Sequence, residues 1–271
     1  MQILIFHQIF LENAIIMSKI LNVPLANNFE PIDNEIYIIF GAHEKPVELY
    51  EIQRTHKIKY IIFNTESHES THFKNKYYIK LLMNNYVFNY SQQISNYLLS
   101  VFNIRTISNF NFYFLLSDST IERLYKVGFI GNISDKRTKI LNEIKEIPEM
   151  NILIDFENKN NNPEDMKRTL IQCNWIINIP YYNHKNFEKH RINNALSCGC
   201  QVVSLRDSMD EETIKEYEPY IFITSDLVAF FKNPPTYKKK SWIEFFNSRK
   251  NKDLIKQNIW AIGKIKYHSK L

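Results

Sequence analysis

Residues Asn186–Ser204 read NFEKHRINNALSCGCQVVS. The stretch opens with charged and polar residues that can start a helix, passes through Ala195 and Leu196, and stops at Gly199. The β-branched run Gln201-Val202-Val203 then predicts a buried parallel strand. In an open α/β sheet, such a segment brings a helix start and a strand end near the crevice where phosphorylated ligands bind.

The composition is that of an ordinary compact protein. The chain has 271 residues, 44% apolar and 23% charged, enough for one large domain or two of about 130 residues each. It has no apolar run of about 18 residues, so we predict no transmembrane segment. The start, MQILIFHQIF, lacks a basic region and a cleavage site, which predicts a first strand and not a signal peptide. Three cysteines do not make a disulfide framework, so we predict a cytoplasmic protein.

The net charge of +5 is mild for this length. A dedicated nucleic-acid binder carries a larger basic excess, so we expect no nucleic-acid partner. Much of the charge comes late, at Lys238-Lys239-Lys240 and in the lysines that follow. Two interpretations stand for this part: a solvated tail, or a peripheral contact with anionic ligands or a membrane surface.

Apolar runs alternate with helical patterns in two series. The first predicts strands at 3–6, 35–40, 59–63 and 86–89, with helices at 12–21, 46–52, 77–82 and 91–98. The second predicts strands at 125–130, 151–156, 175–179, 201–203 and 220–224, with helices between them. This alternation predicts an α/β fold with parallel sheets wrapped by helices. The stretch 110–124 follows neither period, so we place a boundary at about Asp118 and predict domains 1–118 and 119–240.

Titratable side chains follow the first three predicted strands. They are His7, His43 and Glu66. Because parallel strands end at one edge of a sheet, we expect these three residues to meet there, where His7 or His43 can act as a general base. The alternative is that polar residues end strands only because turns face water.

The strand at 125–130 runs into a polar turn and an amphipathic helix. Gly131 and Asn132 lie in the turn, and Lys136, Arg137 and Lys139 follow it. A helix start with basic side chains favours a phosphate or diphosphate. A simple strand-to-helix turn would look similar, because neither the dinucleotide fingerprint nor a P-loop is present.

Several stretches resemble the GT-B glycosyltransferases, which use nucleotide-sugar donors. KVGFIGNISDKRTKILNEIKE (126–146) and WIINIPYYNHKNFEKHRINNALSCGCQVVS (175–204) are similar to the donor half of families 1 and 4. YIIFNTE (60–66) and YYIKLLMNNYVFNYSQQISNYL (77–98) are similar to the acceptor half of a small bacterial and viral group. The resemblance covers roughly residues 1–230. It implies two Rossmann-like domains facing each other across a cleft, with segment 241–271 packing back towards the first.

The resemblance also implies site residues. Glu188 and Arg191 would hold the nucleotide diphosphate-sugar, the carboxylate accepting from hydroxyls and the guanidinium donating to phosphate oxygens. Arg137 would neutralise the leaving diphosphate, so neither a metal nor a cofactor is expected. Retaining members carry a ribose-binding glutamate where this chain has Asn194, whose amide can still bind a hydroxyl. The alternative for Glu188 and Arg191 is an exposed helix pair.

The function that follows is the transfer of a sugar from a nucleotide diphosphate-sugar to a hydroxyl of a glycan or another acceptor. The alternative is a catalytically silent module that binds nucleotide-sugars or phosphates, suggested by Asn194. An inverting transfer needs a base on the acceptor side, whereas a retaining transfer leaves His7, His43 and Glu66 to position the acceptor. The sequence leaves both stereochemical outcomes open.

Overall fold

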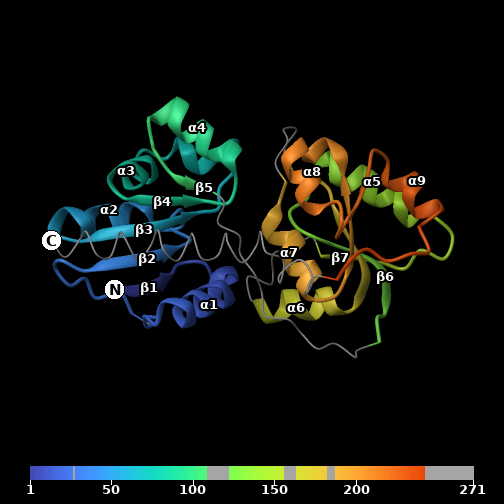
Figure 1. Cartoon of the computed structure of the whole chain (residues 1–271), viewed down its shortest axis with the longest axis horizontal. Coiled ribbons are helices and arrows are strands. Elements are labelled where there is room, and N and C mark those ends of the chain that lie inside the picture. Colours follow the sequence, from blue (N-terminus) through green and yellow to red (C-terminus); the bar gives the residue numbers. More distant parts are fainter. Residues whose placement is uncertain (27, 109–121, 156–162, 182–186, 242–271) are drawn as a thin grey trace. The chain divides into compact units, whose positions relative to one another are not determined.

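The computed structural model describes residues 1–26, 28–108, 122–155, 163–181 and 187–241. These residues form two compact units, one up to residue 108 and one from residue 122, each built on its own parallel sheet (Figure 1). The predicted α/β class with parallel sheets is confirmed. The boundary predicted near Asp118 and all but the first residue of segment 241–271 lie outside the described residues. Within the described ranges, no helix is long and apolar enough to span a bilayer.

The first unit alternates strands with helices. Its strands are β1 (Gln2–Ile5), β2 (Ile36–Phe40), β3 (Lys59–Asn64), β4 (Tyr86–Asn89) and β5 (Ile107–Ser108). Its helices are η1 (Gln8–Phe10), α1 (Leu11–Leu21), α2 (Pro46–Thr55), η2 (Thr71–Lys74), α3 (Lys76–Asn84) and α4 (Gln92–Phe102). The four predicted strands agree with β1 to β4 to within one residue. Strand β5 was not predicted, because two residues cannot show a period.

The sheet of the first unit reverses its strand order beside β1. Strands β1 to β5 lie side by side in chain order and all run parallel. On the other side of β1, Leu25 forms a parallel bridge with Ile3, supported by two backbone hydrogen bonds of 2.9 Å, Ile3 N to Pro24 O and Ala26 N to Ile3 O. The chain therefore pairs first on one side of β1 and then, as β2, on the other. Such a reversal is where open α/β sheets bind ligands.

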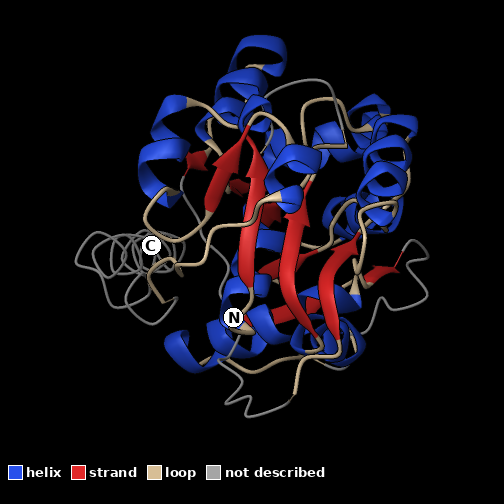
Figure 2. Cartoon of the chain, turned by 90° about the vertical axis from the view of Figure 1, so that its right-hand side faces the viewer, coloured by secondary structure: helices blue, strands red, loops and turns tan. Residues whose placement is uncertain are grey.

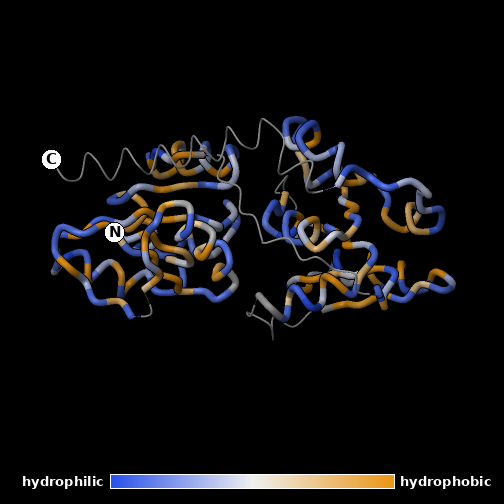
Figure 3. Tube along the Cα trace, turned by 60° about the horizontal axis from the view of Figure 1, so that its bottom comes forward, coloured by the Kyte–Doolittle hydropathy of each residue, from blue (hydrophilic) through white to orange (hydrophobic). Residues whose placement is uncertain are grey.

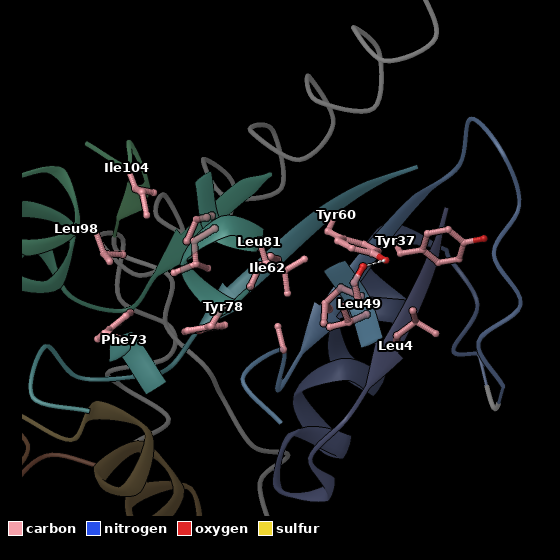
Figure 4. Packing of buried hydrophobic residues seen from close by; sticks show 14 of the residues in the cluster. Leu4, Tyr37, Leu49, Tyr60, Ile62, Phe73, Tyr78, Leu81, Leu98 and Ile104 are labelled. Carbon is pink, nitrogen blue, oxygen red and sulfur yellow. Dashed lines mark hydrogen bonds between the residues drawn. The ribbon is translucent and has the colours of Figure 1, made fainter. Parts of the chain in front are cut away.

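The core of the first unit fills the space between the sheet and helices α2, α3 and α4 (Figure 4). Its fully buried members include Tyr37, Ile62 and Leu81. The hydroxyl of Tyr60 donates to the carbonyl of Leu49 over 3.1 Å, which gives this buried polar group a partner. Figure 3 shows hydrophobic segments running through the interior of both units. Burial of these side chains supplies the main force that holds each sheet to its helices.

The second unit repeats the pattern. Its strands are β6 (Tyr125–Ile130), β7 (Ile152–Asp155), β8 (Cys173–Asn178), β9 (Gln201–Leu205) and β10 (Phe222–Thr224). Its helices are α5 (Asp135–Lys145), α6 (Pro163–Ile171), α7 (Lys189–Ser197), η4 (Arg206–Ser208), α8 (Glu211–Tyr217) and α9 (Leu227–Lys232). All five predicted strands are present, and β8 begins two residues earlier than predicted.

The strand order of the second unit is β10-β9-β8-β6-β7, all parallel. Because β8 lies against β6 and not against β7, the order reverses between β6 and β8. Helices α5 and α9 join the core, whereas α6 and α7 contact each other and the strands outside that core. Figure 2 shows helices packed around the strands. The reversal predicts the ligand side of this unit at the loops that follow β6 and β8.

Helix α7 ends at the predicted glycine. Gly199 has a positive φ of 72°, which favours glycine. Its N–H donates to Leu196 O over 3.0 Å, and Cys200 N–H donates to Ala195 O over 3.1 Å. This pair of bonds is the Schellman motif. It turns the chain directly from α7 into β9, as the sequence predicted.

Candidate functional site

Arg137 occupies the strand-order reversal of the second unit. It lies in the first turn of α5, where Ser134 caps the helix by accepting from Arg137 N–H. Its guanidinium is only 1% exposed. Nε and Nη2 donate to Ile179 O over 2.9 and 2.6 Å, and Nη1 donates to Asn132 O over 2.8 Å. One side chain thus ties the loop after β6 to the loop after β8.

Two arginines share one carboxylate at this point. Arg137 Nη2 lies 3.1 Å from both oxygens of Glu188, and Arg191 Nη1 donates to Glu188 Oε2. Both guanidinium groups lie over the ring of Phe129, at 5.2 and 5.6 Å from its centroid, and Arg137 also lies 5.1 Å from the ring of Tyr181. Two cations and one anion leave a net positive charge. The arrangement therefore favours an added anion.

Burial and the neighbouring Arg191 together lower the pKa of Arg137 to about 10, whereas Glu188 opposes the change. A pKa of about 10 still leaves the group charged at neutral pH. A buried charge is stable only when it is paired and hydrogen-bonded, and Arg137 meets both conditions. We therefore assign it the task of holding the two loops and Glu188 in place. The accessible member of the pair is Arg191, whose side chain is partly exposed.

Gly131 makes room for the arginines. It has a φ of +147°, and a Cβ atom added there would lie 2.6 Å from Arg191 Nη2 and 3.4 Å from Arg137 Nη1. The backbone conformation favours glycine, and a Cβ atom would force the end of the Arg191 side chain to move. The predicted turn residues Gly131 and Asn132 therefore belong to the site. Gly131 leaves room for the Arg191 side chain, and the backbone carbonyl of Asn132 accepts a hydrogen bond from Arg137.

The side chain of Asn194 contacts helix α6. It is 1% exposed, and its Nδ2 lies 3.8 Å from Met166 Sδ on α6. Its Oδ1 has no hydrogen-bond partner among the described residues. The resemblance assigned Asn194 to the donor site, because retaining members carry a ribose-binding glutamate at this position. The structure places its side chain in the α6 contact, and we propose no ligand role for it.

The first unit gathers the three predicted residues at the carboxyl ends of β1, β2 and β3. His43 Nδ1 lies 3.3 Å from Glu66 Oε1, and the rings of His7 and His43 are 6.4 Å apart between centroids. Glu44, which was not predicted, lies between the histidines, 3.3 Å from His43 Nε2 and 4.0 Å from His7 Nε2. The expectation that these strand ends meet at one edge is correct.

His43 is the buried member, with 8% of its side chain exposed. Burial lowers its pKa, and His72 and His7 act in the same direction, whereas Glu66 and Glu44 raise it. The net change keeps the imidazole neutral at neutral pH, the form that can accept a proton. Gly41, with a φ of +77°, lets the loop after β2 pass close to His7. A Cβ atom at position 41 would lie only 2.9 Å from the Cβ of His7.

Sequence reasoning missed His72. It lies in η2, where Ser70 accepts from its backbone N–H, and its Nε2 is 3.9 Å from Glu66 Oε2. Its ring is 4.7 Å from that of His43 between centroids. No strand precedes His72 directly, so the rule that found the other residues did not apply. The only available signal was its position within a few residues of Glu66.

No protein-family model matches this chain, and no curated protein matches it.

Proposed function

We propose that this chain is a glycosyltransferase of the GT-B type, which transfers a sugar from a nucleotide diphosphate-sugar to an acceptor hydroxyl. The second unit would bind the donor and the first unit the acceptor. The observation that supports this most is the pair Arg137 and Arg191 around the single carboxylate of Glu188, at the strand-order reversal. A diphosphate is the anion that best matches such a site, because it adds negative charge beside a loop after a parallel strand.

In this proposal Arg191 contacts the diphosphate. Arg191 Nη1 donates to Glu188, whereas Arg191 Nη2 lies over Gly131, next to the loop where the phosphates would lie. Guanidinium groups bind phosphate oxygens with charge-assisted hydrogen bonds, which strengthen as negative charge grows on the leaving group. Arg137 positions Glu188 and both loops. No metal is assigned to the donor site, since the two cations can stabilise the leaving diphosphate.

The transfer itself would form a bond between the acceptor oxygen and the anomeric carbon while the bond to the diphosphate oxygen breaks. The acceptor proton must leave, and His7, His43 and Glu66 are the base candidates on the acceptor side. An inverting reaction uses one of them as the base, whereas in a retaining reaction they position the acceptor. Determining the anomeric configuration of the product distinguishes the two outcomes.

The donor site is tested by titrating nucleoside diphosphates and a panel of nucleotide sugars into the protein by calorimetry. We expect Arg191→Gln to weaken binding by about 10-fold or more, because a hydrogen bond to a charged group is lost. Arg168→Gln is a matched control, because Arg168 also forms a pair with an acid three residues away, Asp165, but on the exposed side of α6. Absence of binding and of turnover with every donor would contradict the proposal.

One observation favours the silent module as a second candidate. Both oxygens of Glu188 already contact arginine nitrogens, so the carboxylate is engaged before any sugar hydroxyl arrives. This module would bind a nucleotide sugar with the same dependence on Arg191. It would leave the donor intact after prolonged incubation with a panel of acceptors, which an active transferase would not.

A further inference from the structure

We propose that the first unit binds a divalent transition-metal ion of the zinc class, with His43, Glu66 and His72 as its ligands. The three residues each offer one ligand atom, and these atoms all lie within 4.8 Å of one another. Two imidazoles and one carboxylate are a ligand set that suits Zn²⁺ and similar ions, whereas Mg²⁺ and Ca²⁺ prefer oxygen ligands. The inference does not depend on sugar transfer, because it concerns residues of the first unit alone.

The distances fit such an ion. Tetrahedral coordination with bonds of about 2.1 Å places neighbouring ligand atoms about 3.4 Å apart. His43 Nδ1 lies 3.3 Å from Glu66 Oε1, and His72 Nε2 lies 3.9 Å from the other oxygen, Glu66 Oε2. With one ligand atom from each residue, all three atoms lie within 4.8 Å of one another, so binding an ion requires the set to contract. The side chain of His72 is partly exposed on the short helix η2, so its ring can move the small remaining distance.

The surrounding groups hold the ligands as metal sites require. The second nitrogen of His43, Nε2, faces Glu44 Oε1 at 3.3 Å, and a metal-bound histidine commonly donates its other N–H to a carboxylate. Ser70 Oγ donates to Glu66 Oε2 over 2.6 Å and accepts from the backbone N–H of His72 over 3.3 Å. One serine thus fixes both the carboxylate and the helix that carries the second imidazole.

The two carboxylates around His43 give a physical reason for a cation. A neutral imidazole has one N–H, so it can donate to only one of Glu44 and Glu66, and its other nitrogen presents a lone pair to the remaining carboxylate. An ion between Nδ1 and Glu66 removes this repulsion while Nε2–H donates to Glu44. A cluster that holds no ion, in which the side chains contact only one another, is the competing explanation.

Three protein ligands leave a coordination position open. Catalytic zinc sites share this feature, and there the ion lowers the pKa of a bound water or hydroxyl. Under the proposed function, the open position would accept the acceptor hydroxyl. His7, on the far side of Glu44, would then remain as the base candidate.

The experiment titrates Zn²⁺ by calorimetry, and Co²⁺ by visible absorption, into metal-free full-length protein. We expect one ion per chain and the intense absorption of tetrahedral Co²⁺. His72→Asn and Glu66→Gln should each weaken Zn²⁺ binding by at least about 10-fold. His56→Asn is the matched control, because His56 Nδ1 lies 3.3 Å from Asp33 Oδ1 but has no place in the cluster.

Circular dichroism confirms that each variant is folded, and the partly exposed His72 makes its replacement the safest of the three changes. The proposal is overturned if wild-type protein gives no tetrahedral Co²⁺ spectrum. It is also overturned if His72→Asn, like the control His56→Asn, binds Zn²⁺ as wild type does, because the ion would then bind outside this cluster. Nucleoside diphosphate binding by these variants should equal that of wild type, so a failure here is separable from a failure of the donor site.

Discussion

Gly131 is the residue on which the placement of the two arginines depends. We predict that Gly131→Ala lowers the free energy of unfolding by about 1–3 kcal/mol, because its φ of +147° is strained for any other residue. The added methyl group would also displace the guanidinium of Arg191, so nucleoside diphosphate affinity should fall by at least about 10-fold. Urea unfolding and calorimetry measure the two effects separately.

A second variant separates crowding from backbone strain. In an Arg191→Ala background, Gly131→Ala should cost less stability, because the nearest atoms, Nη2 and Cζ of Arg191, are gone. If the cost is equal in both backgrounds, the methyl group does not act through Arg191. That result would remove the argument that Gly131 exists to admit this guanidinium.

Asn194 permits an opposite prediction, in which a polar side chain is replaced without loss. Its Oδ1 is buried and has no partner among the described residues. Asn194→Leu should therefore change the free energy of unfolding by less than about 1 kcal/mol. Asn194→Asp should cost about 2 kcal/mol or more, since it buries a charge. Thermal unfolding of both variants measures these changes, and unchanged nucleotide affinity in Asn194→Leu is expected. A large loss of affinity in that variant would show that the amide does contact the donor.

At the scale of elements, the start of β8 and the turn after α7 are joined by cysteines and one arginine. Arg123 donates to Cys173 O, to Cys198 O over 2.9 Å and to Cys200 Sγ over 3.4 Å. All three cysteines are free and buried. Burial raises the pKa of the Cys173 thiol to about 12 and that of Cys200 to about 11. The thiols of Cys173 and Cys200 contact the carbonyl groups of Thr169 and Leu170 on α6, and the three cysteines lack a paired zinc spacing.

We predict that these thiols react with iodoacetamide at least about 10-fold more slowly in the folded protein than in urea, because the thiolate is the reactive form. A thiol whose pKa is raised on folding stabilises the folded state at a pH below the ordinary thiol pKa of 9.0. This contribution to the free energy of unfolding is lost as the pH rises towards about 11. The urea concentration at the midpoint of unfolding should therefore decrease as the pH rises from 9.0 towards about 11. Mass spectrometry follows the labelling. Equal rates in the folded and unfolded protein would contradict the burial of these thiols.

The elements were predictable because each one carries a local signal. The β-branched and aromatic runs of β3 and β8 are too apolar for anything but a buried strand, and Pro46 and Gly199 mark a helix start and a helix end. Strand order carries no such local signal. The bridge of Leu25 to Ile3 depends on a single residue pair, and it alone places the reversal of the first sheet beside His7.

At the scale of the whole molecule, the polar cluster of each unit lies in the loops that follow its parallel strands. The sequence could predict that strand ends carry His7, His43 and Glu66, because parallel strands end at one edge. It could not predict that Arg137 is buried, because arginine is ordinarily exposed. Arg137 donates to the backbone carbonyl groups of Ile179 and Asn132, and every residue type has such a group, so the sequence gives no signal for these bonds. Residue type reveals which groups are available for chemistry, whereas burial and partners depend on the fold.

Because each unit has its own sheet, core and polar cluster, each ligand should act on its own unit first. We predict that a nucleoside diphosphate slows amide hydrogen exchange in 130–137 and 187–192, and that Zn²⁺ slows it in 41–44 and 64–74, since those segments carry the two clusters. Exchange followed by mass spectrometry on the full chain measures both. Arg191→Gln should remove the nucleotide effect and keep the zinc effect, and His72→Asn should do the reverse. If either ligand protected the segments assigned to the other, the division of the chain into a nucleotide unit and a metal unit would be wrong.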